Sequence, residues 1–425
     1  MDLVCERSRL RGAVEIPGSK SHTIRAVAIA ALAPGESHIR HPLVSEDTKA
    51  AVRTYRALGA LIDADRTGEW VVQGTGGEIS TPPDVIDVAN SGTTLRIGLG
   101  SSALMKKGLA VFTGDAQIRL RPAGPLAQSL NDLGADVRST CGNGCAPFVV
   151  EGRLRGGETT IEAVTSQYLT SLLINTPLAE RDTRIHVAVL NERPYVELTL
   201  DWLRRQGIRL VHEGLEEFHV PGGQTYAPVE RRIPGDFSSG TFFLAAGALG
   251  NNAVDVLGLD MGDTQGDRAV VDYLRAMGAG VTMRDDGIRV QARELCGCEI
   301  DLNATPDALP MMAVLGCFAK GTTRLVNVPQ ARLKETDRIT VMRMELERLG
   351  ARIEELQDGL VVQESALHGG TVDGHGDHRV VMALAVAGTM LSEPTTIHGY
   401  EAVSVTYPGF TEALRRLGGK MRVVE

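Results

Sequence analysis

Apolar and polar residues follow one another along this chain in a pattern that repeats six times. In each repeat a short polar cluster precedes a nearly continuous apolar helix. Ser, Thr, Asp and Asn favour the position before a helix because their side chains accept hydrogen bonds from the first turn. The pattern therefore predicts six helix starts of one kind. They are Gly18-Ser-Lys-Ser21, Asn90-Ser-Gly-Thr-Thr94, Thr165-Ser-Gln167, Asp236-Phe-Ser-Ser239, Thr305-Pro-Asp307 and Gly376-Asp-His-Arg379.

A glycine ends a second, amphipathic helix in each repeat, and a strand-like run such as Val281-Thr-Met283 comes next. Glycine suits this place because it adopts, at little cost, the left-handed conformation that closes a helix. The chain thus reads as six βαβαββ units, which indicates an α/β fold. The six glycines, 68 to 75 residues apart, are Gly59, Gly134, Gly207, Gly278, Gly350 and Gly418.

Two matching segments divide the repeats into two groups of three. A chain of 425 residues is too long for one ordinary hydrophobic core. Residues 11–18 and 229–235 both end in Ile-Pro-Gly and lead to a helix start. We interpret them as two crossings between two domains, with 229–235 as a linker. The predicted domains are 1–18 plus 235–425, which is discontinuous, and 19–234, which is inserted.

Composition excludes several classes of partner. Hydrophobic residues make up 43% of the chain and charged residues 23%, with a net charge of −9. A negative chain is a poor ligand for nucleic acid or an acidic membrane, and no apolar run is long enough to cross a bilayer. The charged first ten residues do not resemble a signal peptide. We therefore expect a cytoplasmic protein that binds neither nucleic acid nor membrane.

The six cysteines include two close pairs, Cys141 with Cys145 and Cys296 with Cys298, but no histidine cluster accompanies either pair. We therefore expect free thiols, buried or without a function, in a reducing compartment, and we expect no metal.

The first polar cluster favours an anion. Lys20 and Arg25 stand at a helix start, where free N–H groups and the helix dipole already attract negative charge. A capped surface helix with scattered basic residues is the alternative. If three such starts converge in each half, two facing trios enclose a cleft for a pair of anionic substrates. A tandem array without a catalytic cleft is the alternative that repetition alone leaves open.

Two further stretches carry candidate anion ligands in the first half of the chain. Gly92 opens a helix where a ligand could approach bare backbone, and Arg96 follows about one turn later. Arg119 and Arg121 share one face if their segment is extended, and Pro122 is then expected to start the next helix. A guanidinium suits phosphate or carboxylate, although a solvated pair is the alternative.

The second half of the chain holds a dense run of charge. Lys334 and Arg338 are four residues apart and share a face if this run is helical. Asp307 reads as a helix cap, and His378 as part of a helix start. Solvated surface charge and a structural histidine are the alternatives.

Taken together, these stretches closely resemble the EPSP synthase (3-phosphoshikimate 1-carboxyvinyltransferase) family over essentially the whole chain. Seven motifs in the right order are far more specific than any one of them. The resemblance implies two domains, each an inside-out α/β barrel of three βαβαββ units, with the site between them. The motifs are Gly18-Ser-Lys-Ser-His-Thr-Ile-Arg25, Asn90-Ser-Gly-Thr-Thr-Leu-Arg96, Arg121-Pro122, Ser166-Gln167, Arg193-Pro-Tyr195, Lys334-Glu-Thr-Asp-Arg338 and Asp377-His-Arg379.

The resemblance also implies a reaction. The enolpyruvyl group of phosphoenolpyruvate passes to the 5-hydroxyl of shikimate 3-phosphate, through a tetrahedral ketal, with release of phosphate. This step of the shikimate pathway leads to chorismate and the aromatic amino acids. It needs no cofactor, it is carried out by a monomer, and glyphosate competes with phosphoenolpyruvate.

The resemblance assigns roles to residues of this chain by motif. Asp307 is expected to act as the base for the 5-hydroxyl and Glu335 as the acid at the methylene carbon, with Lys20 and His378 assisting. The expected shikimate 3-phosphate ligands are Lys20, Ser21, Arg25, Thr165, Ser166, Gln167, Tyr195, Asp307 and Lys334. The expected phosphoenolpyruvate ligands are Lys20, Gly92, Arg121, Gln167, Arg338 and Arg379.

The chain departs from the family pattern at two places. Val405 stands where many members have a lysine, so no phosphoenolpyruvate contact is expected there. Glu192 replaces the usual serine before Arg193. Because a carboxylate repels a substrate phosphate, we expect Glu192 to turn away or to be offset by Arg193.

Three other functions are weighed against this one. The UDP-N-acetylglucosamine enolpyruvyl transferases share the fold but typically have Lys-Asn at Lys20-Ser21 and a loop cysteine near Arg121; here Cys141 and Cys145 lie beyond that loop. An RNA-end-processing protein of similar units is disfavoured by the negative charge and the 4% aromatic content. A non-catalytic anion-binding module would make Asp307 and Glu335 dispensable.

Overall fold

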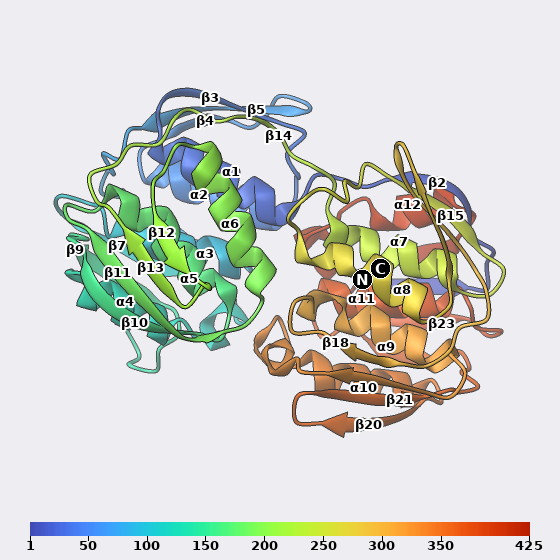
Figure 1. Cartoon of the computed structure of the whole chain (residues 1–425). Helices are drawn as coiled ribbons and strands as arrows, with labels where there is room; N and C mark the ends of the chain where they lie inside the picture. The colour runs from blue at the N-terminus through green and yellow to red at the C-terminus, as the bar shows by residue number, and fades with distance from the viewer. The chain divides into compact units, whose positions relative to one another are not determined.

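The computed structural model describes all residues, Met1–Glu425, and contains two compact units (Figure 1). The inserted unit is Gly18–Ile233, and the terminal unit is Met1–Pro17 with Pro234–Glu425. Each unit holds three four-stranded sheets. None of the helices has the length and apolar character that a membrane span requires.

All six sheets have the same strand order, as the repeat in the middle of the inserted unit illustrates. Its sheet runs β6-β7-β9-β8, in which β6 and β7 are parallel and the other pairs are antiparallel. Helix α3 (Gly92–Ser102) joins β6 to β7, and α4 (Gly124–Asp132) joins β7 to β8. The predicted βαβαββ unit is therefore confirmed. The strands are β6 Ile86–Asp87, β7 Leu109–Thr113, β8 Ala135–Ser139 and β9 Phe148–Gly152.

The other two sheets of the inserted unit are β14-β3-β5-β4 and β10-β11-β13-β12. Their strands are β3 Pro34–Arg40, β4 Leu61–Asp63, β5 Glu69–Thr75, β10 Gly157–Ala163, β11 Thr183–Leu190, β12 Val211–Glu213, β13 Glu217–Val220 and β14 Glu230–Arg232. The helices of these repeats are α1 Lys20–Leu32, α2 Glu46–Ala57, α5 Ser166–Asn175 and α6 Arg193–Arg205.

The terminal unit holds the sheets β16-β17-β15-β2, β18-β19-β21-β20 and β22-β23-β1-β24. The strands are β1 Asp2–Glu6, β2 Arg11–Glu15, β15 Ala253–Leu257, β16 Gly280–Arg284, β17 Gly287–Gln291, β18 Glu299–Asp301, β19 Thr322–Val326, β20 Arg352–Leu356, β21 Gly359–Gln363, β22 Thr371–Asp373, β23 Thr395–His398 and β24 Lys420–Val424. The helices are α7 Phe237–Ala248, α8 Val270–Ala276, α9 Leu309–Phe318, α10 Arg338–Arg348, α11 His378–Gly388 and α12 Phe410–Arg416.

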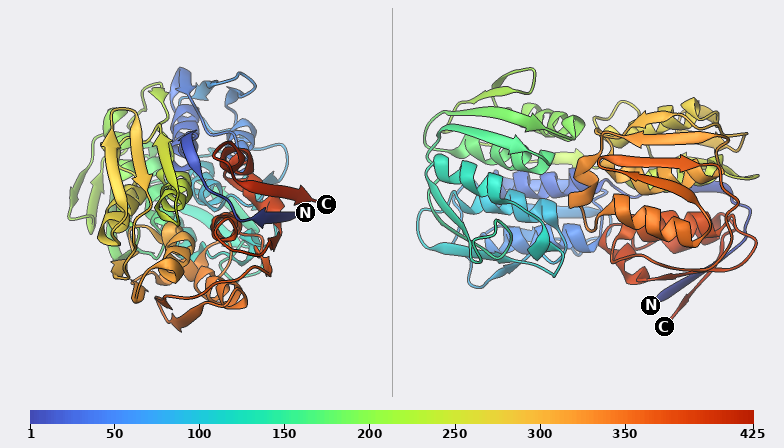
Figure 2. Two further views of the ribbon diagram at one scale, coloured as in Figure 1. Left: turned by 90° about the vertical axis from the view of Figure 1, so that its right-hand side faces the viewer. Right: turned by 90° about the horizontal axis from the view of Figure 1, so that it is seen from below.

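The two crossing segments are built into sheets. β2 pairs in parallel with β15, and β14 pairs in parallel with β3, so each is the first strand of a repeat. The prediction that 229–235 is a linker was wrong in this respect, because the segment forms a strand up to Arg232 and only its end crosses. The two chain ends meet in one sheet, where β1 lies between β23 and β24 (Figure 2).

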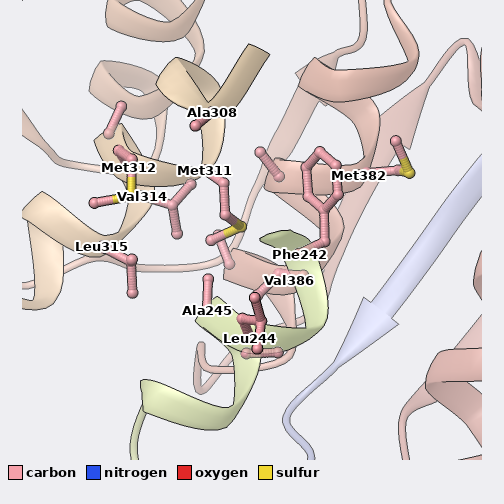
Figure 3. Packing of buried hydrophobic residues seen from close by; sticks show 14 of the residues in the cluster. Phe242, Leu244, Ala245, Ala308, Met311, Met312, Val314, Leu315, Met382 and Val386 are labelled. Carbon is pink, nitrogen blue, oxygen red and sulfur yellow. The ribbon is translucent and has the colours of Figure 1, made fainter. Parts of the chain in front are cut away.

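The first helix of each repeat is buried and lies inside its unit. Every residue of α7 and α11 is buried, whereas the strands alternate between buried and exposed positions. α7, α9 and α11 contact one another, and Phe242, Met311 and Val386 are among the side chains that fill the space between them (Figure 3). A helix that is apolar on every side is stable only in such a position. The predicted fold class, an inside-out α/β barrel in each unit, is confirmed.

The glycines that were predicted to end the second helices do so. All six lie two residues beyond a helix, with φ between 74° and 107°. This left-handed conformation turns the chain sharply toward the next strand, and only glycine adopts it without steric cost.

Replacing Gly207 by alanine tests the cost of that conformation. Gly207 has φ +74°, and a Cβ added there would meet no atom within 4 Å. The change therefore isolates the cost of an L side chain in the left-handed region, about 1–2 kcal/mol. We expect Gly207→Ala to lower the free energy of unfolding in urea by that amount. Gly207→Asn should lower it less, because Asn tolerates this conformation. Equal stability of the alanine variant and the wild-type protein would contradict the prediction.

Candidate functional site

Arg25 joins the starts of three helices in the inserted unit. It is 2% exposed and donates from Nε to Thr199 Oγ1 at 2.9 Å and from Nη2 to Thr170 Oγ1 at 3.2 Å. It also donates to the backbone oxygens of Tyr195 at 3.2 Å and Ser21 at 3.0 Å. Burial lowers the pKa of Arg25 to about 10, which leaves the guanidinium charged at neutral pH. A fixed cation therefore stands between α1, α5 and α6.

Arg96 forms a second junction, between α3 and α5. Its Nη1 donates to Gln167 Oε1 at 2.6 Å, and its Nη2 donates to the backbone oxygen of Pro122 at 2.9 Å. Gly92 packs against this group, since a Cβ at position 92 would lie 2.7 Å from Arg96 Nη1 and 3.2 Å from Arg121 Nη1. Three residues that the sequence singled out, Gly92, Arg121 and Gln167, therefore lie together around Arg96.

Lys20 begins α1 and is held by a carboxylate. Its Nζ lies 3.1 Å from Asp47 Oδ2, and the two side chains are 16% and 6% exposed. His22, two residues after Lys20, accepts a hydrogen bond at its Nδ1 from Trp202 Nε1 at 2.9 Å. This bond connects α1 to α6. The ammonium group is thus fixed at the helix start by its neighbours.

The polar residues before most first helices do not cap them. Ser19, Ser91, Thr165 and Asp236 occupy the N-cap positions of α1, α3, α5 and α7, but their side chains accept no capping hydrogen bond from a backbone nitrogen of the first turn. The predicted capping was therefore wrong there. It is right for α11, where Asp377 Oδ1 accepts from the backbone nitrogen of Arg379 at 2.8 Å.

Glu192 lies against the start of α5. Its Oε2 accepts hydrogen bonds from Ser166 Oγ at 2.7 Å, from the Ser166 backbone nitrogen at 3.0 Å and from Thr165 Oγ1 at 3.1 Å. Arg193 is exposed and donates to the backbone oxygen of Gly214. The expectation that Glu192 turns away or is offset by Arg193 was therefore wrong, because three donors of α5 hold the carboxylate in place.

In the terminal unit, a buried arginine is surrounded by carboxylates. Arg338 is fully buried and donates to Asp307 Oδ1 at 2.7 Å, to Glu335 Oε2 at 2.5 Å and to Asp377 Oδ2 at 2.7 Å. Burial alone would lower the pKa of Arg338, but the charges of Asp377, Glu335 and Asp307 outweigh burial and raise it. The guanidinium is therefore a permanent cation.

Asp307 connects this arginine to two more cations. Its Oδ2 lies 3.0 Å from Arg379 Nη2, and its Oδ1 lies 3.9 Å from Lys334 Nζ. Five residues that the resemblance singled out thus form one cluster, composed of Asp307, Lys334, Glu335, Arg338 and Arg379. His378 begins α11 beside it and is 1% exposed. Val405 ends a short 3₁₀ segment of the same unit, Tyr400–Val405.

Two local predictions in these stretches were wrong. Lys334 lies outside α10, which begins at Arg338 because Asp337 caps it by accepting from the backbone nitrogen of Thr340. Lys334 and Arg338 meet at Asp307 instead of on one helix face. Asp307 itself is no cap, since the short 3₁₀ turn that contains it follows Thr305.

The Arg121 segment also differs from its prediction. Ile118–Leu120 forms a 3₁₀ turn instead of an extended run, because the backbone nitrogen of Ile118 donates to the Asp115 side chain. Arg119 and Arg121 therefore point apart: Arg119 is exposed, while Arg121 is 7% exposed and donates to Asn90 Oδ1 at 3.0 Å. The following helix, α4, begins two residues after Pro122.

Sequence reasoning missed the partners of these cations. Asp47, Thr170, Thr199 and Asp377 hold Lys20, Arg25 or Arg338, yet no spacing rule pairs residues so far apart. Only Asp377, next to His378 in a quoted motif, carried a usable signal. No three His, Cys, Asp or Glu side chains are close enough to hold a metal ion, and all six cysteines are free thiols.

Replacing Asp377 by asparagine tests the buried ion pair. Asparagine can still cap α11, so the change removes mainly the charge beside Arg338. Loss of one partner of a buried pair costs roughly 3 kcal/mol. We expect Asp377→Asn to lower the free energy of unfolding by about this amount. The matched control is Glu347→Gln, in an exposed pair with Arg343 on α10, which should cost less than about 0.5 kcal/mol. Equal losses in a denaturation experiment would contradict the prediction.

Comparison with known proteins places this geometry in a family. The family model described as EPSP synthase (3-phosphoshikimate 1-carboxyvinyltransferase) matches residues 4–414. The chain is 52% identical to the 3-phosphoshikimate 1-carboxyvinyltransferases of Ruminiclostridium cellulolyticum, over 424 residues, and Acetivibrio thermocellus, over 425, with full coverage of both chains in each case. An EPSP synthase structure from Acinetobacter baumannii superimposes with a TM-score of 0.84 at 27% identity, covering 100% of both chains. The chain therefore belongs to the EPSP synthase family.

Proposed function

We propose that this chain transfers the enolpyruvyl group of phosphoenolpyruvate to the 5-hydroxyl of shikimate 3-phosphate and releases phosphate. The observation that carries the proposal is the cluster of Asp307, Lys334, Glu335, Arg338 and Arg379, in which two carboxylates and three cations meet at helix starts. Relatives 52% identical over the full length are named for this reaction.

Phosphoenolpyruvate carries a phosphate and a carboxylate, and we infer that arginines hold both. Guanidinium groups bind such anions through paired N–H donors. Arg338 and Arg379 would take one anionic group, and Lys20 and Arg121 the other. Gln167 and the bare backbone of Gly92 would complete the site. A Cβ at position 92 would lie 2.7 Å from Arg96 Nη1, so a side chain there would force that guanidinium to shift.

Shikimate 3-phosphate would lie against the starts of α1, α5 and α6. Ser21 and Arg25 come from α1, and the hydroxyls of Thr165 and Ser166 come from the start of α5. Helix starts with hydroxyl groups are suited to phosphate oxygens. Gln167, Tyr195 and Lys334 would contact the ring and its hydroxyls, and Lys20 would reach both substrates.

The proposed chemistry uses two carboxyl groups in opposite roles. Asp307 takes the proton of the 5-hydroxyl, whose oxygen bonds to C2 of phosphoenolpyruvate. The electron pair of the C2–C3 double bond takes a proton from Glu335, which gives the tetrahedral ketal. In the second step the carboxylate of Glu335 removes a proton from C3 and the double bond re-forms. As that double bond forms, the C2–O bond to phosphate breaks, and phosphate leaves with the proton that Asp307 held.

Substrate binding would prepare Asp307 for this role. Arg338 and Arg379 now donate to its two oxygens. When the anions of phosphoenolpyruvate take over these donors, the carboxylate loses hydrogen bonds and holds a proton more readily. The charge of Lys20 would stabilise the leaving phosphate, and His378 would support the neighbouring Arg379.

We further infer a cytoplasmic monomer that requires no cofactor and is inhibited by glyphosate in competition with phosphoenolpyruvate. Six free thiols fit a reducing compartment.

The test of the reaction is a phosphate-release assay. We expect release only when shikimate 3-phosphate and phosphoenolpyruvate are both present, because the 5-hydroxyl is the attacking group. UDP-N-acetylglucosamine in place of shikimate 3-phosphate should give no release. Release with that sugar nucleotide, or none with the proposed pair, would overturn the assignment.

The test of the two carboxyl groups is a pair of isosteric variants. Asp307→Asn and Glu335→Gln keep the shape of the side chains but cannot exchange protons at neutral pH. We expect kcat to fall on the order of 100-fold or more in each. Asp272→Asn, in an exposed pair on α8, is the matched control and should keep normal turnover. Near-normal kcat in both site variants, with folding verified by circular dichroism, would remove their assigned roles.

A further inference from the structure

The carboxylate of Glu192 occupies a position that suits a phosphate oxygen. It is 2% exposed, and one of its oxygens accepts a backbone N–H and two hydroxyl hydrogens at the start of α5. A helix start with hydroxyl donors attracts any anion, whether it comes from the protein or from a ligand. The protein has filled this position with its own negative charge.

Capping of α6 does not explain why the carboxylate of Glu192 lies against the start of α5. Glu192 occupies the N-cap position of α6, but its side chain makes no capping bond there and reaches across to α5 instead. Its backbone φ is 57°, a left-handed conformation that residues other than glycine rarely adopt. Three hydrogen bonds of the carboxylate therefore go to Thr165 and Ser166 at the start of α5.

The same donors are required by the substrate in the reaction proposed above. Thr165 and Ser166 are the residues expected to hold the 3-phosphate of shikimate 3-phosphate. Two anions cannot accept the same hydrogens, and their charges repel each other. Either the phosphate displaces Glu192 or it binds without these donors.

We infer that Glu192 is a resident anion whose carboxylate must leave the start of α5 when shikimate 3-phosphate binds, and that it thereby weakens the preference of the enzyme for phosphorylated over unphosphorylated shikimate. The inference rests on the proposed function. Unphosphorylated shikimate leaves Glu192 in place and breaks no bond. Shikimate 3-phosphate must first break three hydrogen bonds to the carboxylate.

Arg25 lies close enough to feel the charge of Glu192. Arg25 lies within electrostatic range, since the charge of Glu192 favours its protonated form against the effect of burial. The guanidinium is anchored to α1, α5 and α6 and does not depend on Glu192 for its position.

The decisive variant is Glu192→Ser, which removes the carboxylate and leaves the donors of α5 to the substrate. We expect the KM for shikimate 3-phosphate to fall roughly tenfold or more, which corresponds to the loss of one charged competitor for these hydrogens. The kcat and the KM for phosphoenolpyruvate should stay within about twofold. The ratio of kcat/KM for shikimate 3-phosphate to that for shikimate should rise.

Two further variants separate charge from structure. Glu192→Gln keeps the shape and an accepting oxygen but loses the charge, so its KM should lie between those of the wild type and the serine variant. Glu197→Ser removes a charge from the exposed side of α6 and should leave the KM for shikimate 3-phosphate unchanged. A purely structural role for Glu192 predicts lower stability and no gain in affinity in either variant.

Different results would contradict the proposed reaction and the proposed role of Glu192. Calorimetric titration with shikimate 3-phosphate alone measures binding without turnover. Tighter binding by Glu192→Ser without phosphate release in any variant would defeat the proposed reaction and uphold the resident anion. Phosphate release with an unchanged or higher KM for shikimate 3-phosphate in Glu192→Ser and Glu192→Gln would overturn the resident anion and leave the reaction intact.

Discussion

The structure depends on burying the first helix of each repeat. A helix that is apolar on every side must be enclosed, and three sheets around three such helices enclose them in each unit. The backbone groups along these helices are satisfied internally, but the first-turn N–H groups are not. The ends of the helices are therefore the places where polar chemistry concentrates. Most N-cap side chains leave those groups to other partners.

Charge neutralisation explains why so many buried cations are tolerated at the starts of these helices. Arg338 is balanced by three carboxylates, Lys20 by Asp47, and Arg25 is held by hydroxyls and backbone oxygens. A buried charge without such partners would be very costly. The carboxylates next to the cations therefore serve two purposes in the proposed reaction: they keep the site folded, and they are exchanged for the anions of the substrates.

Sequence alone predicted the features that follow from local chemistry. The six helix starts, the left-handed glycines and the βαβαββ repeat all appear where the pattern put them, because each depends on a few neighbouring residues. Predictions that depended on one particular side-chain hydrogen bond failed, whether the partner is near or far along the chain. The turn at Ile118–Leu120 depends on Asp115, the start of α10 depends on Asp337, and the orientation of Glu192 depends on donors from α5. The family resemblance predicted the site residues, but their pairings follow from the tertiary fold.

The meeting of the two chain ends in one sheet has a consequence for synthesis. β1 pairs with β24 from Asp2 to Glu6, so this pairing can form only after β24 has been synthesised. The inserted unit, by contrast, has its final strand once residue 232 has been made. On a ribosome, which releases the chain from its N-terminus, the inserted unit can close while more than a hundred residues are still to be added. The terminal unit can complete its sheet only after β23 and β24 have been made, and until then β1 has two unpaired edges that can bind other chains.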